Sequence, residues 1–545
     1  MKSIVKLSLA VAILVFAFGC SKSFLNTPPI DTPTSDNFYR TDAEIQAGTA
    51  PLYNIVWFDY NDKAFMAFGT GKGGDLLSND RTAYIQFSVS ATDVFALLPG
   101  YKSFYKIVAQ SNQTIQNILN AKNSSATQKM MNTGVAECRF MRGMAYFYLV
   151  SNWGAVPIIY NNLDQMSNDL YRNNIEDVWK FIILDFTYAA NNLPATPYQQ
   201  GRVTKYSAEG MLAKAYLTRA GYGQSGTRLQ SDLDSAKYYA ADVCTNSGNS
   251  LLPNYHDLFL SANNNSSNNN VENLFALQWM PYSGAPYPWG INNSFQAYVA
   301  FSTDITQTGD GWGSAQGASA DLLKYYLANP LDSIRRKETF MFPGDYYPEI
   351  EQKTGGLNIS LDTANPAHIK KYVIGSPADN GGKGMNMAAY INTYMLRLAE
   401  VYLIYADAIL GNSASTSDAT ALQYFNAVRT RAGMPTESSI TFKDIFQEKR
   451  IETAMEGNAW YDILRWYYFD PKAARDYVAG QDKGSYKLYP IIGSNPRKWN
   501  AIFTSAYWPV TDQTVYLPLP ESELNIATNL GKPPVPFDFS KLPNY

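Results

Sequence analysis

The segment 135–151 constrains the fold most, because its apolar residues cover too wide an arc for a surface helix. Two neighbouring stripes follow helical spacing, one through Phe140, Met144 and Phe147 and the other through Met141, Ala145 and Tyr148. A helix with two apolar stripes must pack on more than one side. Similar spacing recurs over 104–119, 175–192, 207–220 and 234–244. The sequence therefore predicts a mostly α fold, a tetratricopeptide-like scaffold of stacked helix pairs, without a clean 34-residue repeat.

A long irregular insert interrupts this helical pattern. Residues 261–270 are a polar, asparagine-rich run that is typical of a loop. The segment 271–384 is rich in glycine, proline and aromatic residues, and only 320–328 has the spacing of a short helix. We therefore expect a loop-rich insert with few short strands, held on a rigid helical scaffold. Binding residues tend to collect on loops of this kind.

Helical spacing returns after the insert and continues into the last part of the chain. The predicted helices span 395–410, 419–432 and 442–456, and residues 515–520 are predicted to be extended. The expected organisation is one composite body with an N-terminal helical region (37–260), an insert (261–394) and a C-terminal helical region (395–545).

The N-terminus has the pattern of a secretory signal. Lys2 and Lys6 precede an unbroken apolar run over 7–18, which is shorter than the roughly 20 residues of a membrane-spanning helix. The run ends in Ala-Phe-Gly before Cys20, which resembles a bacterial lipobox. We predict a lipoprotein signal peptide over 1–19, lipidation of Cys20 and an extended tether over 20–36. The alternative is a plain signal peptide with an incidental cysteine. No later stretch is apolar enough to cross a bilayer.

Several separated segments resemble the SusD/RagB family of lipid-anchored nutrient-binding proteins. They occur in the family's order, at residues 24–29, 36–39, 138–150, 153–157 (WGAVP), 201–205, 394–407, 448–457 and 517–524 (beginning LPLP). The resemblance implies a SusD-like fold and a cell-surface protein that binds glycans without catalysis. It also implies a partner, a SusC-like TonB-dependent transporter in the outer membrane. Family members often carry acidic residues after the lipidated cysteine, whereas here Ser-Lys-Ser follows, yet we expect an outer-membrane protein that faces the cell exterior.

Composition and motif context argue against several other functions. A net charge of −3 disfavours nucleic-acid binding, and the two histidines are too far apart in sequence to indicate a metal site. Residues 69–74 match G-x-G-x-x-G but lack the strand and helix of a nucleotide fold, so they are interpreted as a flexible turn. We expect no cofactor, no metal and no enzymatic activity.

Three glutamates remain as a catalytic alternative. Glu448, Glu452 and Glu456 are spaced four apart, so one helix face carries all three carboxylates. Their short separation invites comparison with the carboxylate pair of a retaining glycosidase. An ion network with Lys449, Arg450 and Arg465 is the favoured interpretation, because catalytic carboxylates normally face each other across a cleft.

Aromatic side chains are the strongest candidates for ligand contact. A sugar ring has an apolar C–H face and a hydroxyl rim, which suits the flat and partly polar rings of Trp and Tyr. The predicted ligand-binding residues are Trp57, Tyr60, Tyr282, Tyr287, Trp289 and Tyr298. Trp312 is interpreted as a structural plug beneath a turn, and Trp153 and Trp466 as core residues. A peptide or protein ligand on the same scaffold is the main alternative.

Overall fold

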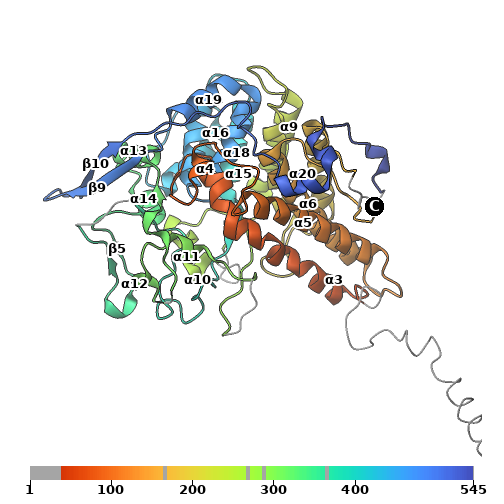
Figure 1. The fold of residues 1–545 in the computed structure, drawn as a ribbon, viewed down its shortest axis with the longest axis horizontal. Helices are drawn as coiled ribbons and strands as arrows, with labels where there is room; N and C mark the ends of the chain where they lie inside the picture. Colours follow the sequence, from red (N-terminus) through yellow and green to blue (C-terminus); the bar gives the residue numbers. More distant parts are fainter. Residues whose placement is uncertain are drawn as a thin grey trace, which may run out of the picture.

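The computed structural model describes residues 38–163, 169–264, 270–284, 290–307, 309–361 and 367–543. The predicted signal peptide, the tether and Cys20 lie outside these residues. Five long helices build the N-terminal region: α5 (Leu97–Leu119), α6 (Gln128–Trp153), α7 (Ile175–Asn192), α8 (Lys205–Arg219) and α9 (Gln230–Asn246). Each packs against the next in the chain, as expected for stacked helix pairs (Figure 1).

Helix α6 lies at the centre of this layer. Thr127 caps its start by accepting a hydrogen bond from the Met130 N–H, and Gly154, with φ 69°, ends it. Every residue from Thr133 to Trp153 is buried except Arg139. The neighbours α5, α7 and α3 (Asp42–Thr49) contact α6. The prediction that this segment packs on more than one side is therefore confirmed.

The C-terminal region adds five helices and a hairpin. The helices are α15 (Leu398–Leu410), α16 (Ala419–Arg431), α17 (Phe442–Glu452), α18 (Ala459–Phe469) and α19 (Pro471–Gly480). Strands β9 (Ser485–Ile491) and β10 (Lys498–Thr504) pair antiparallel and extend from the body in Figure 1. Helix α15 packs on α9, which joins this region to the N-terminal helices. The predicted helix over 442–456 ends earlier than expected, and α18 and α19 were not predicted.

The insert contains more regular structure than the sequence predicted. Besides α13 (Ala320–Ala328), which matches the prediction, it holds α11 (Phe295–Val299), α12 (Thr303–Thr306) and α14 (Ser333–Thr339). Its first strand, β2 (Asn273–Leu277), pairs antiparallel with β8 (Thr393–Arg397), so the two ends of the insert meet. The expectation of one short helix was therefore wrong, because short amphipathic turns leave too little periodicity to recognise.

The remaining elements are short. In the N-terminal region they are η1 (Ala50–Tyr53), η2 (Ile55–Trp57), η3 (Tyr60–Ala64), η4 (Met66–Gly71), β1 (Leu76–Leu77), α4 (Thr82–Ile85) and η5 (Tyr255–Leu258). In the insert they are α10 (Ser261–Asn264), η7 (Gly313–Ala315), β3 (Gly317–Ala318), β4 (Phe340–Met341), β5 (Tyr346–Tyr347), η8 (Gln352–Thr354), β6 (Leu357–Asn358) and β7 (His368–Ile369). The tail holds α20 (Glu521–Ile526), η9 (Thr528–Gly531) and η10 (Phe539–Lys541).

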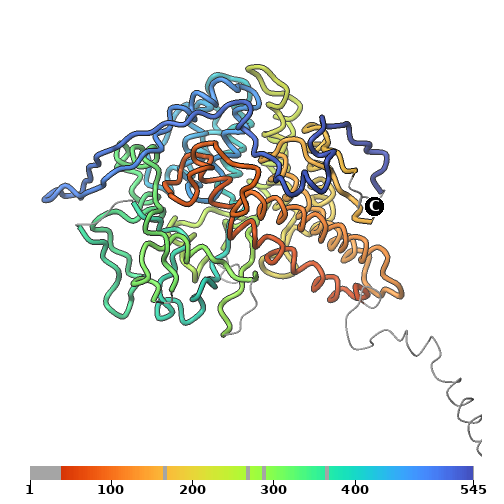
Figure 2. The backbone as a smooth tube through the Cα atoms, in the orientation of Figure 1, coloured from red at the N-terminus to blue at the C-terminus, as the bar shows by residue number. Residues whose placement is uncertain are grey.

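One main hydrophobic core joins the three regions. It includes Trp179 from α7, Phe275 from the insert and Trp460 from α18, all nearly inaccessible to solvent. In the tube view, the N-terminal helices, the insert and the C-terminal helices lie next to one another in one body (Figure 2). Within the described residues, no helix reaches the length and apolarity of a bilayer span. Cys138 is buried and Cys244 is half-buried, and both are free thiols.

The glycine-rich motif at residues 69–74 is not the flexible turn that was predicted. Gly69 and Gly71 lie in η4 and are fully buried. A Cβ atom on Gly69 would come within 1.9 Å of the carbonyl oxygen of Gly457, so two backbone segments touch at this point. The glycines therefore serve close packing of backbones, which is a common reason for glycine inside an element.

Candidate ligand-binding surface

Two of the predicted ligand-binding aromatics are core residues. Trp57 and Tyr60 are inaccessible to solvent, and their rings pack edge to face 6.1 Å apart. The Trp57 indole N–H donates to the Leu52 carbonyl, so its polar atom is also satisfied internally. Neither ring presents a face to a ligand, and this prediction was wrong. Trp57 and Tyr60 belong to the buried helical turns η2 and η3 rather than to an exposed loop.

Three other predicted residues follow β2 in the sequence, between Leu277 and Gly290, a stretch of which the structure describes residues 278–284 as a loop. Tyr287 and Trp289 fall outside the described residues, so their role stays a prediction. Tyr282 is half-buried, and its backbone N–H donates to the Lys383 carbonyl at 2.7 Å. The loop returns at Gly290, where an added Cβ would lie 3.7 Å from Ile55. The described ends of this loop therefore reach the outer edge of η2.

Tyr298 forms an aromatic pair with a residue that had not been assigned to the site. Tyr298 is half-buried on α11, and its ring lies 5.5 Å from the Trp312 ring at an interplanar angle of 82°. Trp312 is 50% exposed, which makes it one of the most open aromatic side chains of the insert. The interpretation of Trp312 as a plug beneath a turn is corrected, because the ring lies at the surface.

The backbone around Trp312 is fixed although its ring is open. The N–H groups of Gly311 and Trp312 both donate to the Ala297 carbonyl, and the Gly313 N–H donates to Ala300. The indole N–H donates to the Gly309 carbonyl at 2.7 Å. The ring is therefore held in place before any ligand arrives, which reduces the ordering cost of binding.

Lys63, on η3, lies beside the Tyr298–Trp312 ring pair and contacts Tyr298. Lys63 Nζ donates to the Tyr298 hydroxyl at 2.9 Å and lies 2.7 Å from Oδ2 of the buried Asp62. Asp62 in turn accepts a short hydrogen bond from the Ser294 hydroxyl. Burial lowers the pKa of Lys63, but the hydrogen bonds with Asp62 and Tyr298 outweigh this and raise it. Lys63 is therefore a fixed ammonium donor whose charge is largely balanced by Asp62.

Only three residues of the helical stretch 55–71 reach the surface, and they lie on one face. Ile55, Asp59 and Lys63 are spaced four apart, while every other residue from 56 to 71 is buried. With Tyr298 and Trp312 they form a continuous strip, which we call the Trp312 surface. Ile55 connects this strip to the loop at Gly290. The predicted ring positions Tyr287 and Trp289 precede Gly290 in the sequence.

The chemistry of the Trp312 surface suits an uncharged, polyhydroxylated ligand. Two ring faces offer apolar contact, and a phenol hydroxyl, an ammonium and a carboxylate at the margin can exchange hydrogen bonds with hydroxyl groups. No group of three or more His, Cys, Asp or Glu side chains able to hold a metal occurs in the described parts of the chain.

The glutamates weighed as a catalytic alternative lie in the interior. Glu448 pairs with Arg429 at 2.9 Å, Glu452 with Arg397 at 3.0 Å, and Glu456 with both Arg397 and Lys371 at 2.8 Å. All three are at most 3% exposed, so no substrate reaches them in this structure. The prediction that these glutamates belong to an ion network is confirmed. The cations that pair with them, however, are not the predicted Lys449, Arg450 and Arg465.

The cations that were expected to balance these glutamates serve other carboxylates. Lys449 pairs with Glu400 and Asp462, and Arg465 pairs with Asp407. Arg450 pairs with Asp75 and Asp321 across the body. The sequence could not reveal these partners, because they come from segments far away along the chain.

Comparisons with known proteins agree with this architecture. The family described as "SusD family" matches residues 295–534, and the family described as "Starch-binding associating with outer membrane" matches residues 78–217. A SusD-like protein of Bacteroides ovatus is 38% identical, and the alignment covers 98% of each chain. This chain belongs to the SusD family. The resemblance inferred from its separated sequence segments is thereby confirmed.

Solved structures of SusD-like proteins share the fold. A crystal structure with xylogluco-oligosaccharide has a TM-score of 0.82 and 38% identity, and the match covers 91% of this chain and 99% of the other. A laminarin-binding SusD-like protein has a TM-score of 0.66 at 20% identity, over 90% of this chain and 98% of the other. The starch-binding protein SusD of Bacteroides thetaiotaomicron is 24% identical over 65% of this chain and 69% of its own length.

Proposed function

We propose that this SusD-family protein captures uncharged oligosaccharides on the Trp312 surface and does not modify them. The observation that carries the proposal is the half-exposed Trp312 ring, held by backbone hydrogen bonds beside Tyr298 and Lys63. An open ring on a rigid support offers stacking without a large loss of conformational entropy. Tyr282, Tyr287 and Trp289 are proposed to extend the same surface along the adjacent loop.

The names of similar proteins support a glycan as the ligand class. A structure at 38% identity contains a xylogluco-oligosaccharide, and a more distant relative is named for starch binding. The Trp312 surface has no excess of positive charge that would favour an anionic glycan, since the buried Asp62 balances Lys63 and the other charged residue of the surface is Asp59. Several weak subsites along a long glycan would strengthen binding through multivalency.

Binding to oligosaccharides should depend on Trp312. We expect Trp312→Ala to weaken the affinity for the best ligand among xylogluco-, laminari- and malto-oligosaccharides by about tenfold or more, since 1.4 kcal/mol corresponds to a tenfold change. Isothermal titration calorimetry measures this directly. Tyr238→Ala, which removes a 69% exposed tyrosine from α9, is the matched control and should bind normally.

Three results would contradict this assignment. Unchanged affinity in Trp312→Ala would remove the Trp312 surface from the site. Binding of peptide pools but no glycan would favour the peptide-capturing alternative. Release of reducing ends from a bound polysaccharide would show catalysis.

We further propose that the protein is anchored in the outer membrane through lipidated Cys20, faces the cell exterior and passes its ligand to a SusC-like TonB-dependent transporter. The family match to proteins associating with the outer membrane supports the location.

We expect Cys20→Ala to abolish palmitate labelling and to release the protein from the outer-membrane fraction. Copurification of a TonB-dependent transporter with the lipidated protein, lost in Cys20→Ala, would support the partnership. Retention of the label would contradict lipidation at this residue.

A further inference from the structure

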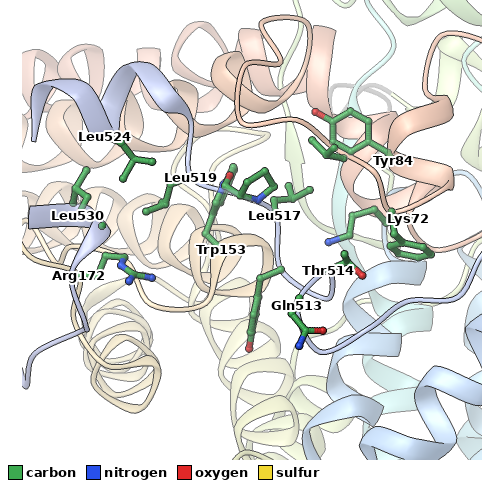
Figure 3. A pocket seen from close by; sticks show the side chains of 15 residues that line it. Lys72, Tyr84, Trp153, Arg172, Gln513, Thr514, Leu517, Leu519, Leu524 and Leu530 are labelled. Atoms are coloured by element: carbon green, nitrogen blue, oxygen red, sulfur yellow. The ribbon is translucent and has the colours of Figure 1, made fainter. Parts of the chain in front are cut away.

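A second candidate binding site is a cavity that is separate from the Trp312 surface. A cavity of about 460 Å³ opens between the C-terminal end of α6, the segment 72–89 and the chain segment 513–531 (Figure 3). It shares no lining residue with the Trp312 surface. Its size is within the range of small-molecule sites.

The two charged side chains that line this cavity are both cationic and lie at its opposite ends. Figure 3 shows Lys72 at one end and Arg172 at the other, with Trp153, Leu517 and Leu519 between them. No Asp or Glu is among the described residues that line it. Neither Lys72 nor Arg172 forms an ion pair with any carboxylate in the part of the chain that the structure describes.

This lack of a counter-ion is unusual for the interior of this protein. Arg142, Arg335 and Arg397, which are as buried as Lys72, each contact at least one carboxylate. Lys72 is 1% exposed, and its ammonium nitrogen donates to the Val515 carbonyl at 2.9 Å and lies 4.0 Å from the centroid of the Trp460 ring. A buried ammonium held by one carbonyl and one ring retains unused donor capacity.

Arg172 also has donor capacity to spare. One terminal nitrogen donates to the Lys532 carbonyl at 2.8 Å, while the buried Nε has no hydrogen-bond partner among the described residues. A guanidinium presents its N–H groups as a planar fork that matches a carboxylate. Burial lowers the pKa of both Lys72 and Arg172, which a bound anion would oppose.

We infer that this cavity binds a small organic carboxylate with a flat or aliphatic apolar body. The carboxylate is held by the Arg172 fork, and the apolar body lies along Trp153, Leu517 and Leu519. The Lys72 end adds a second positive charge together with the polar side chains of Gln513 and Thr514. An uncharged molecule of the same shape would leave both cations without a counter-ion.

The test uses two carboxylates and their neutral esters. Calorimetry on the purified protein compares 4-hydroxycinnamate and octanoate with the corresponding methyl esters. At least one acid should bind at least tenfold more tightly than its ester. Arg172→Gln should remove most of this difference, and Lys72→Met should reduce it. Lys102→Gln is the matched control, because Lys102 is an exposed cation on α5 beside the cavity and pairs with Glu523.

The outcomes separate the inference from its alternatives. Equal binding of acid and ester, no binding of either acid, or acid binding unaffected by Arg172→Gln would overturn it. Tighter binding of glucuronate than of both acids would overturn the assignment to an apolar body. Thermal unfolding of each variant shows whether it is folded, and Arg172→Gln, at a half-buried residue, keeps the inference testable even if Lys72→Met is unstable. Oligosaccharide binding at the Trp312 surface should remain unchanged in Arg172→Gln.

Discussion

At the scale of single residues, Lys483 is an unusually placed cation. Its side chain is 4% exposed, lies 4.4 Å from the centroid of the Phe87 ring, and has no hydrogen-bond partner for Nζ among the described residues. Burial lowers the pKa of Lys483 to about 7, and attraction to Asp321 offsets this only in part. A lysine in the unfolded chain has a pKa near 10.4.

Replacing this lysine should stabilise the fold in a pH-dependent way. Between about pH 7 and pH 10 the unfolded chain binds more protons than the folded chain, so the cost of Lys483 falls as pH rises. We expect Lys483→Met to raise the free energy of unfolding by about 1–3 kcal/mol at pH 6 and to lose this gain near pH 10. Urea denaturation of both proteins at several pH values measures the difference.

The neighbouring strand provides the control for this experiment. Lys487 is exposed on β9, so Lys487→Met should change the free energy of unfolding by less than about 0.5 kcal/mol at every pH. A pH-independent effect of Lys483→Met would show that Lys483 is not a desolvated cation in the folded protein.

Residue type alone could not separate ligand-binding aromatics from core aromatics. Trp57 and Tyr60 are aromatic like Trp312, but their rings are buried, whereas the Trp312 ring is half exposed. The burial of Trp57 and Tyr60 results from contacts with α5 and α6, which no local sequence pattern encodes. Tyr298 was predicted as a surface residue, and the structure places it beside Trp312.

At the scale of elements, the contact between η4 and the turn after α17 depends on glycine. We expect Gly69→Ala to lower the free energy of unfolding by at least about 2 kcal/mol, because its Cβ would collide with the Gly457 backbone. Gly480→Ala is the matched control. Gly480 ends α19 with no atom within 4 Å of an added Cβ, and alanine there should be neutral or slightly stabilising. Thermal and urea unfolding compare the variants, and equal stability of both would contradict the close approach.

The helices α7 and α13 could be predicted from the sequence, whereas α18 could not. The bounds of α7 and α13 agree with their predicted ranges, because polar residues separate their apolar positions at regular intervals. In α18 only Asp462 and Arg465 are charged, so few polar residues mark the solvent-facing side of a helix there.

At the scale of the whole molecule, one arginine connects the insert with the C-terminal region. Arg397, the last residue of β8, contacts Glu272 beside β2, Glu452 in α17 and Glu456 after it, at 2.6–3.0 Å. All four side chains are nearly inaccessible to solvent. The predicted boundary at 394–395 therefore does not separate two independently packed units.

Loss of Arg397 should weaken the molecule as a unit. We expect Arg397→Ala to cost about 3–5 kcal/mol, since it leaves three buried carboxylates short of a partner. Arg475→Ala, which removes an exposed pair with Asp512, should cost less than about 1 kcal/mol. Tryptophan fluorescence and far-UV circular dichroism should report coincident midpoints for the wild-type protein. Two separate transitions in the wild-type protein would contradict a shared core.

The chain segment that covers Lys72, Trp153 and Arg172 has a consequence for the timing of biosynthesis. These side chains donate to the carbonyls of Val515, Pro518 and Lys532, which follow them by 443, 365 and 360 residues. At about 5–20 residues per second, a ribosome needs roughly 20–90 s to deliver these acceptors. During that interval the newly made helices remain uncovered on this side. We therefore expect a nascent chain that stays open, and accessible to chaperones, until its last residues have emerged.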